Sequence, residues 1–289
     1  MSTSFSKVTA YITPVKSFTD TPEEKGILHS VSSFDERGNM IHSVTYQDGK
    51  TKKETSECAY NSDNALIEET VTHHLDGFTQ KRIIEINKNE GTTTERTVYT
   101  DGSESKSEIR YSRTGKPLQT IHYYDDVSIE SQDEYTYDDQ DRLTVHIIKD
   151  GDGAIISEDT IAYTDHTREI IHAEDGSETG EVQHLNDSGL PVRIERYEGD
   201  TVYQEETNDF DSAGRLVASK LSEMGVPVRE RVIEYDAAGN IVIEQLNDLR
   251  YRRTEKVART FDNANRLLTE SRYSTFGSGE SYRLMFEYE

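Results

Sequence analysis

The chain has little of what most folded proteins use to hold a core together. It contains one cysteine, no tryptophan and five prolines among 289 residues, and hydrophobic residues make up 33% of it. The single cysteine, Cys58, excludes an intrachain disulfide framework. Because globular chains are usually about 45–50% apolar, a deep core along the whole length is not expected.

Long hydrophobic runs are also missing. No segment approaches the roughly 20 apolar residues of a membrane-spanning helix. Residues 1–16 lack the basic head and the apolar run of a signal peptide. We therefore expect no membrane insertion, and a protein that stays in the cytoplasm or is released without a cleaved signal peptide.

Motifs that carry chemistry are missing as well. The sequence contains no Gly-x-Ser-x-Gly, P-loop, dinucleotide-binding or Cys-x-x-Cys motif. His73 and His74 are neighbours, so they would point to opposite faces of a strand. His146 and His172 would lie two strands apart, about 9.6 Å, which is too far to share one metal ion. We expect no enzyme, no catalytic residue, no metal and no cofactor.

What the chain does contain is one phrase of eight residues, repeated about ten times. Tyr235–Val242 reads Tyr-Asp-Ala-Ala-Gly-Asn-Ile-Val, and close copies begin at Phe34, Tyr137, Phe210 and Phe261, usually at multiples of 25 or 26 residues. The Asp after the aromatic residue can bond its own backbone, and Gly three residues later tolerates a positive φ. We call this segment the turn phrase, because it predicts a turn followed by a strand.

A second turn signal falls midway between most turn phrases. Examples are Asp101-Gly102 and Asp175-Gly176, and Asp-Gly between extended runs is a strong hairpin signal. The residues between turns are mostly Thr, Val, Ile, Tyr, Glu, Arg and Ser, without helical spacing. We predict an all-β protein, a repetitive antiparallel β-hairpin meander of about 20 strands that forms an elongated or a coiled, spiral sheet.

The ends of the chain differ from its middle. Residues 1–33 are predicted to form an N-terminal capping hairpin, and residues 34–289 to form about ten repeat units in one continuous body. At the other end, Tyr282–Tyr288 alternates apolar and polar residues and would present an open edge. Such an edge would be the seam of a homo-oligomer, or the point where a longer protein was divided.

The recurring Tyr-Asp-x-x-Gly-Arg-Leu pattern resembles the YD repeat of the RHS family of bacterial proteins. Phe210–Val217, Tyr235–Val242 and Phe261–Leu268 carry the likeness best, and it covers roughly residues 34–289. The resemblance implies a long β-sheet that spirals, in some members into a shell around a toxin. The Asp-Pro-x-Gly-Leu motif with which the family cleaves itself does not occur.

Negative charge is concentrated in the middle of the chain. The formal net charge is −24, and residues 125–211 hold 26 acidic residues against five basic ones, a charge of −21 for this stretch. Like charges on every second strand, about 9.6 Å apart, repel one another. Their concentration favours a functional role for the negative electrostatic field, such as attracting a partner, although charge also keeps a polar sheet soluble. The predicted partner-binding residues are Glu130, Asp133, Glu134, Glu158, Asp159, Glu178, Glu181, Glu205 and Glu206.

These patterns favour a non-catalytic β-repeat scaffold that binds a basic protein through an acidic central face. The resemblance implies a bacterial toxin or secretion system as its setting. A nucleic-acid partner is not expected, because phosphate binding needs a concentrated basic face. The alternative is a cell-surface or particle component that binds carbohydrate through exposed rows of tyrosine.

Overall fold

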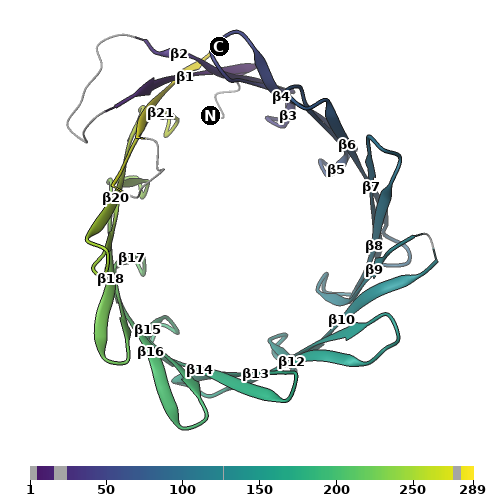
Figure 1. Cartoon of the computed structure of the whole chain (residues 1–289), viewed down its shortest axis with the longest axis vertical. Coiled ribbons are helices and arrows are strands. Elements are labelled where there is room, and N and C mark those ends of the chain that lie inside the picture. Colours follow the sequence, from purple (N-terminus) through teal and green to yellow (C-terminus); the bar gives the residue numbers. More distant parts are fainter. Residues whose placement is uncertain (1–4, 16–24, 126, 276–280) are drawn as a thin grey trace. The chain divides into compact units, whose positions relative to one another are not determined.

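The computed structural model describes residues 5–15, 25–125, 127–275 and 281–289. All regular structure in these residues is β-strand, and 22 strands follow one another as an antiparallel meander in one sheet (Figure 1). The prediction of an all-β protein built from consecutive hairpins is therefore confirmed.

The strands are seven to ten residues long. The first eleven are β1 (Lys7–Pro14), β2 (Ile27–Phe34), β3 (Met40–Tyr46), β4 (Lys52–Tyr60), β5 (Leu66–His73), β6 (Phe78–Asn87), β7 (Thr92–Tyr99), β8 (Glu104–Tyr111), β9 (Pro117–Tyr123), β10 (Ile129–Tyr137) and β11 (Leu143–Asp150). The others are β12 (Ile155–Tyr163), β13 (Thr167–Glu174), β14 (Ser177–Leu185), β15 (Pro191–Glu198), β16 (Thr201–Phe210), β17 (Leu216–Glu223), β18 (Val226–Tyr235), β19 (Ile241–Asp248), β20 (Arg253–Phe261), β21 (Leu267–Ser274) and β22 (Tyr282–Tyr288).

The chain divides into two compact units. The first comprises Met1–Glu54, His184–Glu195 and Val202–Glu289, and the second comprises Thr55–Gln183 and Arg196–Thr201. Within the first unit, β16 to β22 pair in chain order, β22 pairs with β1, and β1 to β3 continue the series. Within the second unit, β5 to β13 pair in chain order.

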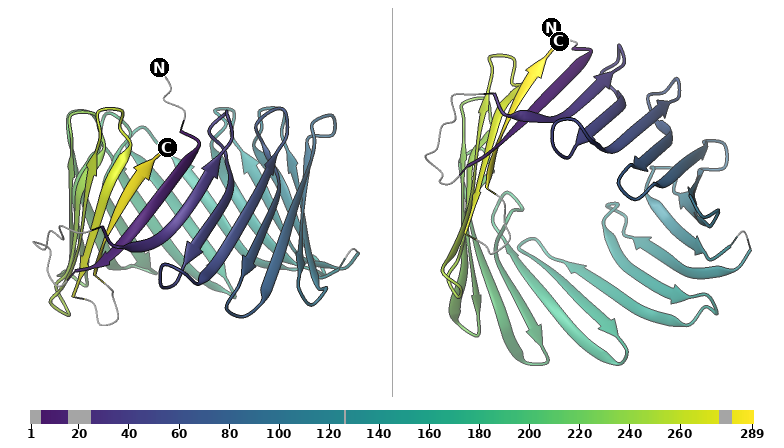
Figure 2. Two further views of the ribbon diagram at one scale, coloured as in Figure 1. Left: turned by 90° about the horizontal axis from the view of Figure 1, so that it is seen from above. Right: turned by 45° about the horizontal axis from the view of Figure 1, so that its top comes forward.

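The sheet is closed, because its first strand pairs with its last. β1 lies against β22 from Val8 opposite Tyr288 to Pro14 opposite Tyr282, and against β2 on its other edge (Figure 2, purple and yellow). The prediction of an elongated or spiral sheet is therefore wrong. Pairing satisfies the backbone donors and acceptors that an open edge would leave exposed.

Two expectations about the chain ends change with this finding. The N-terminal hairpin forms over β1 and β2, but it does not cap an end of the sheet, because β1 also pairs with β22. β22 has β21 on one side and β1 on the other. The open edge on which the predicted homo-oligomer depended is thus absent from the structure.

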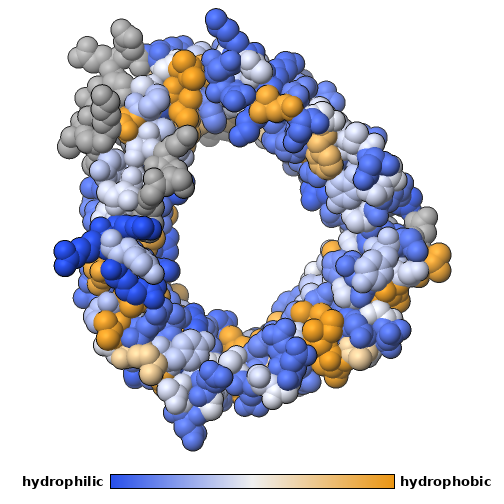
Figure 3. Space-filling view, in the orientation of Figure 1, coloured by the Kyte–Doolittle hydropathy of each residue, from blue (hydrophilic) through white to orange (hydrophobic). Residues whose placement is uncertain are grey.

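The core is thin, as the low apolar content predicts. Among the described residues, only six hydrophobic side chains are buried: Ala10, Val44, Ile194, Val228, Ile233 and Val257. Figure 3 shows hydrophilic side chains predominating on the face in view, with hydrophobic ones in separate small groups. Strand pairing and polar side-chain contacts therefore carry much of the cohesion of each unit.

The turn phrase forms the predicted turn. Its aromatic residue follows a shift in strand register, for example at Tyr137, Phe210 and Tyr235, and such a bulge re-aims a side chain. The fifth position of the phrase has a positive φ, whether it is Gly239 or Asp141. Small or Asx residues are the ones that tolerate this conformation, which explains why Asp and Asn replace Gly there.

The two kinds of turn lie at opposite ends of the hairpins. Because an antiparallel meander reverses at every turn, phrase turns and Asp-Gly turns alternate along the chain. Within each unit, every hairpin therefore presents its phrase turn at one edge and its second turn, which is Asp-Gly in many of the hairpins, at the other. We call the second of these the Asp-Gly edge.

Candidate binding surfaces

The aspartate of the turn phrase is fixed by its own turn. Oδ1 of Asp35 accepts bonds from the backbone N–H groups of Arg37 and Asn39, both at 2.9 Å. The Asn39 side chain, followed by its backbone N–H, lowers the pKa of Asp35 to about 2. The same pair of backbone bonds recurs at Asp138, Asp211, Asp236 and Asp262. These aspartates serve the fold.

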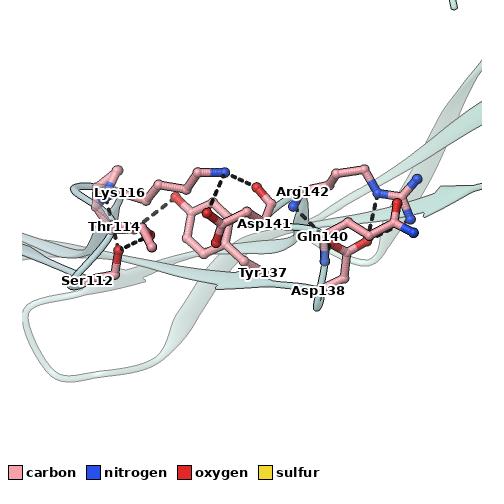
Figure 4. Close-up of polar contacts among 9 residues, drawn as sticks. Ser112, Thr114, Lys116, Tyr137, Asp138, Gln140, Asp141 and Arg142 are labelled. Carbon is pink, nitrogen blue, oxygen red and sulfur yellow. Dashed lines mark hydrogen bonds and ion pairs between the residues drawn. The ribbon is translucent and has the colours of Figure 1, made fainter.

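The basic residue at the sixth position joins neighbouring turn phrases. Nη2 of Arg142 lies 2.7 Å from Oδ2 of Asp138 in its own phrase, and its guanidinium stacks 4.2 Å from the ring centre of Tyr163 in the next. Lys116 takes this position in the preceding phrase, where its ammonium bonds the carbonyl of Asp141 (Figure 4). Equivalent stacked pairs are Arg215 with Tyr235 and Arg266 with Tyr288.

The phrase tyrosine also bonds the preceding repeat. The hydroxyl of Tyr137 donates to the carbonyl of Pro117 at 2.9 Å, and that of Tyr235 donates to Leu216 at the same distance. The hydroxyls of Tyr163 and Tyr288 do likewise. These tyrosines are half-buried and their hydroxyls are hydrogen-bonded, so they do not form exposed rows. Carbohydrate binding through other tyrosines stays a prediction.

A row of alternating histidine and aspartate side chains crosses β9 to β13. Asp133 lies 3.4 Å from Nε2 of His122 and 2.8 Å from Nε2 of His146. Asp159 lies 3.5 Å from Nδ1 of His146 and 2.6 Å from Nδ1 of His172. The strand register makes this possible, because His146 stands directly opposite Asp159, and Asp159 opposite His172. We call these five residues the His–Asp row.

The hydrogen bonds of the His–Asp row shift the pKa of one of its histidines, His172. Its hydrogen bond to Asp159 is the main reason why the pKa of His172 is raised. The ring of His146 also stacks on Tyr135, with centroids 4.7 Å apart. Within the described residues, no group of three or more His, Cys, Asp or Glu side chains is arranged to hold a metal ion.

The predicted acidic residues do not share one face. Because strand side chains alternate, Asp133 and Asp159 belong to the face of the His–Asp row, while Glu134 and Glu158 flank Ile147 on the other face. The same alternation separates Glu205, opposite Ser222, from Glu206, opposite Leu221. The two members of each of these three pairs therefore lie on opposite faces of the sheet although they are adjacent in sequence.

Most of the predicted acidic residues already have partners. Glu134 pairs with Lys149, Glu181 with Arg196 and Glu205 with Arg193, each at 2.7 Å. Glu206 also takes part in a polar or electrostatic interaction and is not free. Glu130 and Glu178 are exposed and Glu158 is half-buried, and no ion pair joins these three to described residues.

The five cations of residues 125–211 are all engaged within the sheet. Besides the three pairs above, Arg142 bonds Asp138, and Nη2 of Arg168 donates to Oε1 of Gln183 at 2.6 Å. Four of these cations are paired with carboxylates and Arg168 with a neutral amide, and the stretch keeps a formal charge of −21 with all five counted. Its negative field therefore remains available to a partner.

The Asp-Gly edge of the second unit combines negative charge with exposed apolar groups. Val127 is 83% exposed, Tyr124 69% and Ile155 57%. Tyr124 and Val127 belong to the turn at 124–128, and Ile155 begins β12 directly after the turn at 151–154. These two turns and the next one, at 175–176, contain acidic residues and no Lys or Arg. We define the acidic–apolar edge by Tyr124, Asp125, Val127, Asp152, Ile155 and Asp175.

A hollow of about 460 Å³ lies over β16 to β21 in the first unit. Three ion pairs line it: Arg231 with Glu244 at 2.6 Å, Arg259 with Glu270 at 2.8 Å and Arg272 with Glu255 at 2.5 Å. The rest of the lining consists of Glu206, Ser219, Leu221, Arg229, Leu246 and Val257. Arg229 is exposed and forms no ion pair with a described residue.

Neither the His–Asp row nor the hollow was predicted from the sequence. A signal for the row exists: Asp133, His146, Asp159 and His172 are spaced by 13 residues, half of the repeat. In hairpins of this length, that step places residues on the same face of adjacent strands, directly opposite one another at His146, Asp159 and His172 and diagonally at Asp133 and His146. The hollow has a weaker signal, the two arginines Arg229 and Arg231 on one face of a strand.

No helix capable of crossing a lipid bilayer occurs in the described part of the chain.

No protein-family model matches this sequence, and no curated protein matches it. Among solved structures, the chain is similar to a porin-like protein from Bacteroides uniformis ATCC 8492, with 12% identity, a TM-score of 0.35 and coverage of 99% of this chain and 98% of that one. A porin-like protein from Bacteroides vulgatus ATCC 8482 has 11% identity, a TM-score of 0.25 and the same coverage. The TcdB2-TccC3 structure without its hypervariable C-terminal region has 10% identity and a TM-score of 0.38, over 89% of this chain and 16% of that one.

Proposed function

We propose that this protein is a non-catalytic binding scaffold whose acidic–apolar edge binds a basic protein partner. One observation carries the proposal. The five cations of residues 125–211 are all bonded inside the sheet, while the carboxylates of the edge stand beside exposed apolar side chains.

The chemistry of this edge suits a partner with lysine or arginine around an apolar patch. Burial of Tyr124, Val127 and Ile155 against such a patch would supply affinity, since desolvated apolar and aromatic anchors dominate interface energies. Asp152 and Asp175 would attract the basic residues of the partner and speed its approach. Water is excluded from the anchors while the charges remain at the rim.

The edge supports this role better than the strand faces do. On the faces, Asp133 and Asp159 are held by histidines, and Glu134 is held by Lys149. A partner would have to break these contacts before using the carboxylates. Of the residues predicted from the sequence, Glu130, Glu158 and Glu178 stay in the proposal, because they form no ion pair with described residues.

The test is a charge reversal at the edge, Asp152→Lys with Asp175→Lys. The matched control is Glu36→Lys with Glu57→Lys, which changes the net charge equally at exposed acids outside residues 125–211. The probe is a synthetic peptide of alternating lysine and leucine, titrated at two salt concentrations. We expect the edge variant to weaken binding about ten-fold or more, the control to have little effect, and added salt to weaken binding to the unchanged protein.

Equal losses in the edge variant and the control would show that net charge alone attracts the peptide, and the proposal would fail. A third variant, Val127→Ser with Ile155→Ser, separates anchoring from attraction. It keeps the charge and should raise the dissociation rate of the peptide, because anchors act mainly on dissociation. An unchanged dissociation rate would remove the apolar part of the proposal.

We also propose that the chain is related to YD-repeat proteins. The Tyr, Asp and basic positions of the turn phrase each make a repeated contact, which supports a common origin of the phrase. The basic partner would then be a component of a bacterial toxin or secretion system. The genes that neighbour this one test the setting: a cluster without any such component would count against it.

A further inference from the structure

We infer that the hollow over β16 to β21 is a second binding site, for a small organic anion in which one carboxylate is attached to an apolar body. This inference rests on the first unit alone and is independent of the acidic–apolar edge. The volume of about 460 Å³ lies within the usual range for small-molecule sites, roughly 300–1,000 Å³.

Arg229 provides the attraction for the anion. Its guanidinium is exposed at the hollow and has no ion-pair partner among the described residues. A guanidinium offers five N–H donors in a planar fork that matches a carboxylate. Arg231 lies two residues along the same strand and therefore on the same face. Its Nε and Nη2 both donate to Oε1 of Glu244, which leaves Nη1 as a further donor.

The other charges of the hollow select for a single negative charge. Three arginines of the lining are neutralised by Glu244, Glu255 and Glu270, and Arg229 is the one that forms no ion pair with a described residue, although Asp248 stands directly opposite it on β19. The carboxylates of Glu244, Glu255 and Glu270 remain close by. A dianion such as a phosphate monoester would be repelled by them, whereas a monocarboxylate needs only one guanidinium.

Apolar side chains provide a place for the body of the ligand. Leu221 stands directly opposite Arg229, Leu246 opposite Arg231, and Val257 on the next strand opposite Glu244. Val257 is further away, because the residue of β20 in line with Arg229 is Arg253, four residues before it. A ligand with its carboxylate at Arg229 therefore rests its apolar body on Leu221 and Leu246, which lie on the strands at either side of β18.

The experiment is a calorimetric titration of the whole protein with 4-phenylbutyrate and with its neutral amide, 4-phenylbutyramide. These probes share one apolar body and differ in charge. The site variant is Arg229→Gln. The matched control is Arg113→Gln, which removes an exposed guanidinium with no ion pair to described residues from the second unit.

We expect saturable binding of 4-phenylbutyrate, at least about ten-fold weaker binding of the amide, and a similar loss for the carboxylate in Arg229→Gln. Arg113→Gln should bind as the unchanged protein does. The inference fails if the carboxylate does not saturate, if the amide binds equally well, or if the two variants behave alike. A reversal of charge at the acidic–apolar edge should leave this binding unchanged, which keeps the two sites experimentally separate.

Discussion

At the scale of single residues, the tyrosine of the turn phrase is a hydrogen-bond donor to the preceding repeat at several places along the chain. Tyr235 donates its hydroxyl to the carbonyl of Leu216. Phe210 has no hydroxyl, and there the side-chain amide of Asn208 donates instead to Pro191, at 3.0 Å. Pro191 holds the same position in its phrase as Leu216 does in the next, so the carbonyl keeps a donor although the residue that supplies it has changed.

If the tyrosine hydroxyl and the asparagine amide are equivalent donors, adding one should restore the stability lost by removing the other. Tyr235→Phe should lower the free energy of unfolding by about 1 kcal/mol, because it removes the donor from a half-buried carbonyl. Asn208→Ala should cost a similar amount. Phe210→Tyr should restore stability to Asn208→Ala while adding little to the unchanged protein, as measured by urea unfolding. If the double variant is no more stable than Asn208→Ala alone, the two donors are not equivalent.

Single residues explain why the turns were predicted correctly and why the acidic residues were wrongly grouped on one face. The Asp and Gly positions predicted the turns, because their conformational needs are local. Acidic residues such as Glu158 and Asp159 were grouped as one surface, yet adjacent strand residues point to opposite faces. Alternation is a local rule and could have been applied, whereas the partners of these acids depend on the register of neighbouring strands.

At the scale of elements, β14 and β15 meet through a glycine and an aromatic ring. Gly180 is buried, and a Cβ atom there would clash with the ring of Tyr197. The hydroxyl of Tyr197 donates to Glu169 at 3.1 Å, which holds the ring over the glycine. Glycine in a strand often marks such a close approach.

Gly180→Ala should therefore lower the free energy of unfolding by about 1–3 kcal/mol, because the ring must move. In a Tyr197→Leu background the same substitution should cost much less. Urea unfolding of the four proteins completes a double-mutant cycle. Additive effects of the two substitutions would show that the clash is not the cause.

The His–Asp row predicts a pH effect at the same scale. Because Asp159 raises the pKa of His172 above its ordinary 6.5, protonated His172 stabilises the folded chain. This contribution is full below pH 6.5 and is lost as the pH rises through the raised value. The titratable groups that face His172 are Asp159 of the row and Glu174 on its own strand, and both are acidic.

His172→Gln should flatten the change in unfolding free energy between pH 6 and pH 8, while His29→Gln should not. His29 is a suitable control because burial lowers its pKa, so its contribution has the opposite sign. Urea unfolding across this range measures both. A loss of stability on acidification that His172→Gln abolishes would contradict the sign argued here.

At the scale of the whole molecule, the closing pair β1–β22 is the feature that the sequence did not predict. The hairpins follow from local turns, and 22 strands were close to the expected number. Closure depends on a contact between strands at opposite ends of the chain. The alternation of Tyr282–Tyr288 suits an open edge and a paired strand equally well, so it could not distinguish them.

A disulfide across this pair tests closure directly. Thr9 and Glu287 are directly opposite, and facing residues in an antiparallel pair have Cα atoms about 4.5–5.5 Å apart, which suits a disulfide. In a Cys58→Ser background, Thr9→Cys with Glu287→Cys should oxidise in air to an intramolecular crosslink, seen by mass spectrometry. Thr9→Cys with Thr254→Cys should not. Equal crosslinking of the two proteins, or none in the first, would contradict the pairing.

Because β1 pairs with β22, residues from the two ends of the described chain are neighbours in space. The backbone N–H of Ser6 donates to the carbonyl of Glu289 at 2.8 Å. A short linker could therefore join these ends, and the chain could be opened instead between Ala237 and Ala238, in an exposed turn. Such a circular permutant would keep every strand neighbour while starting its synthesis at a different repeat.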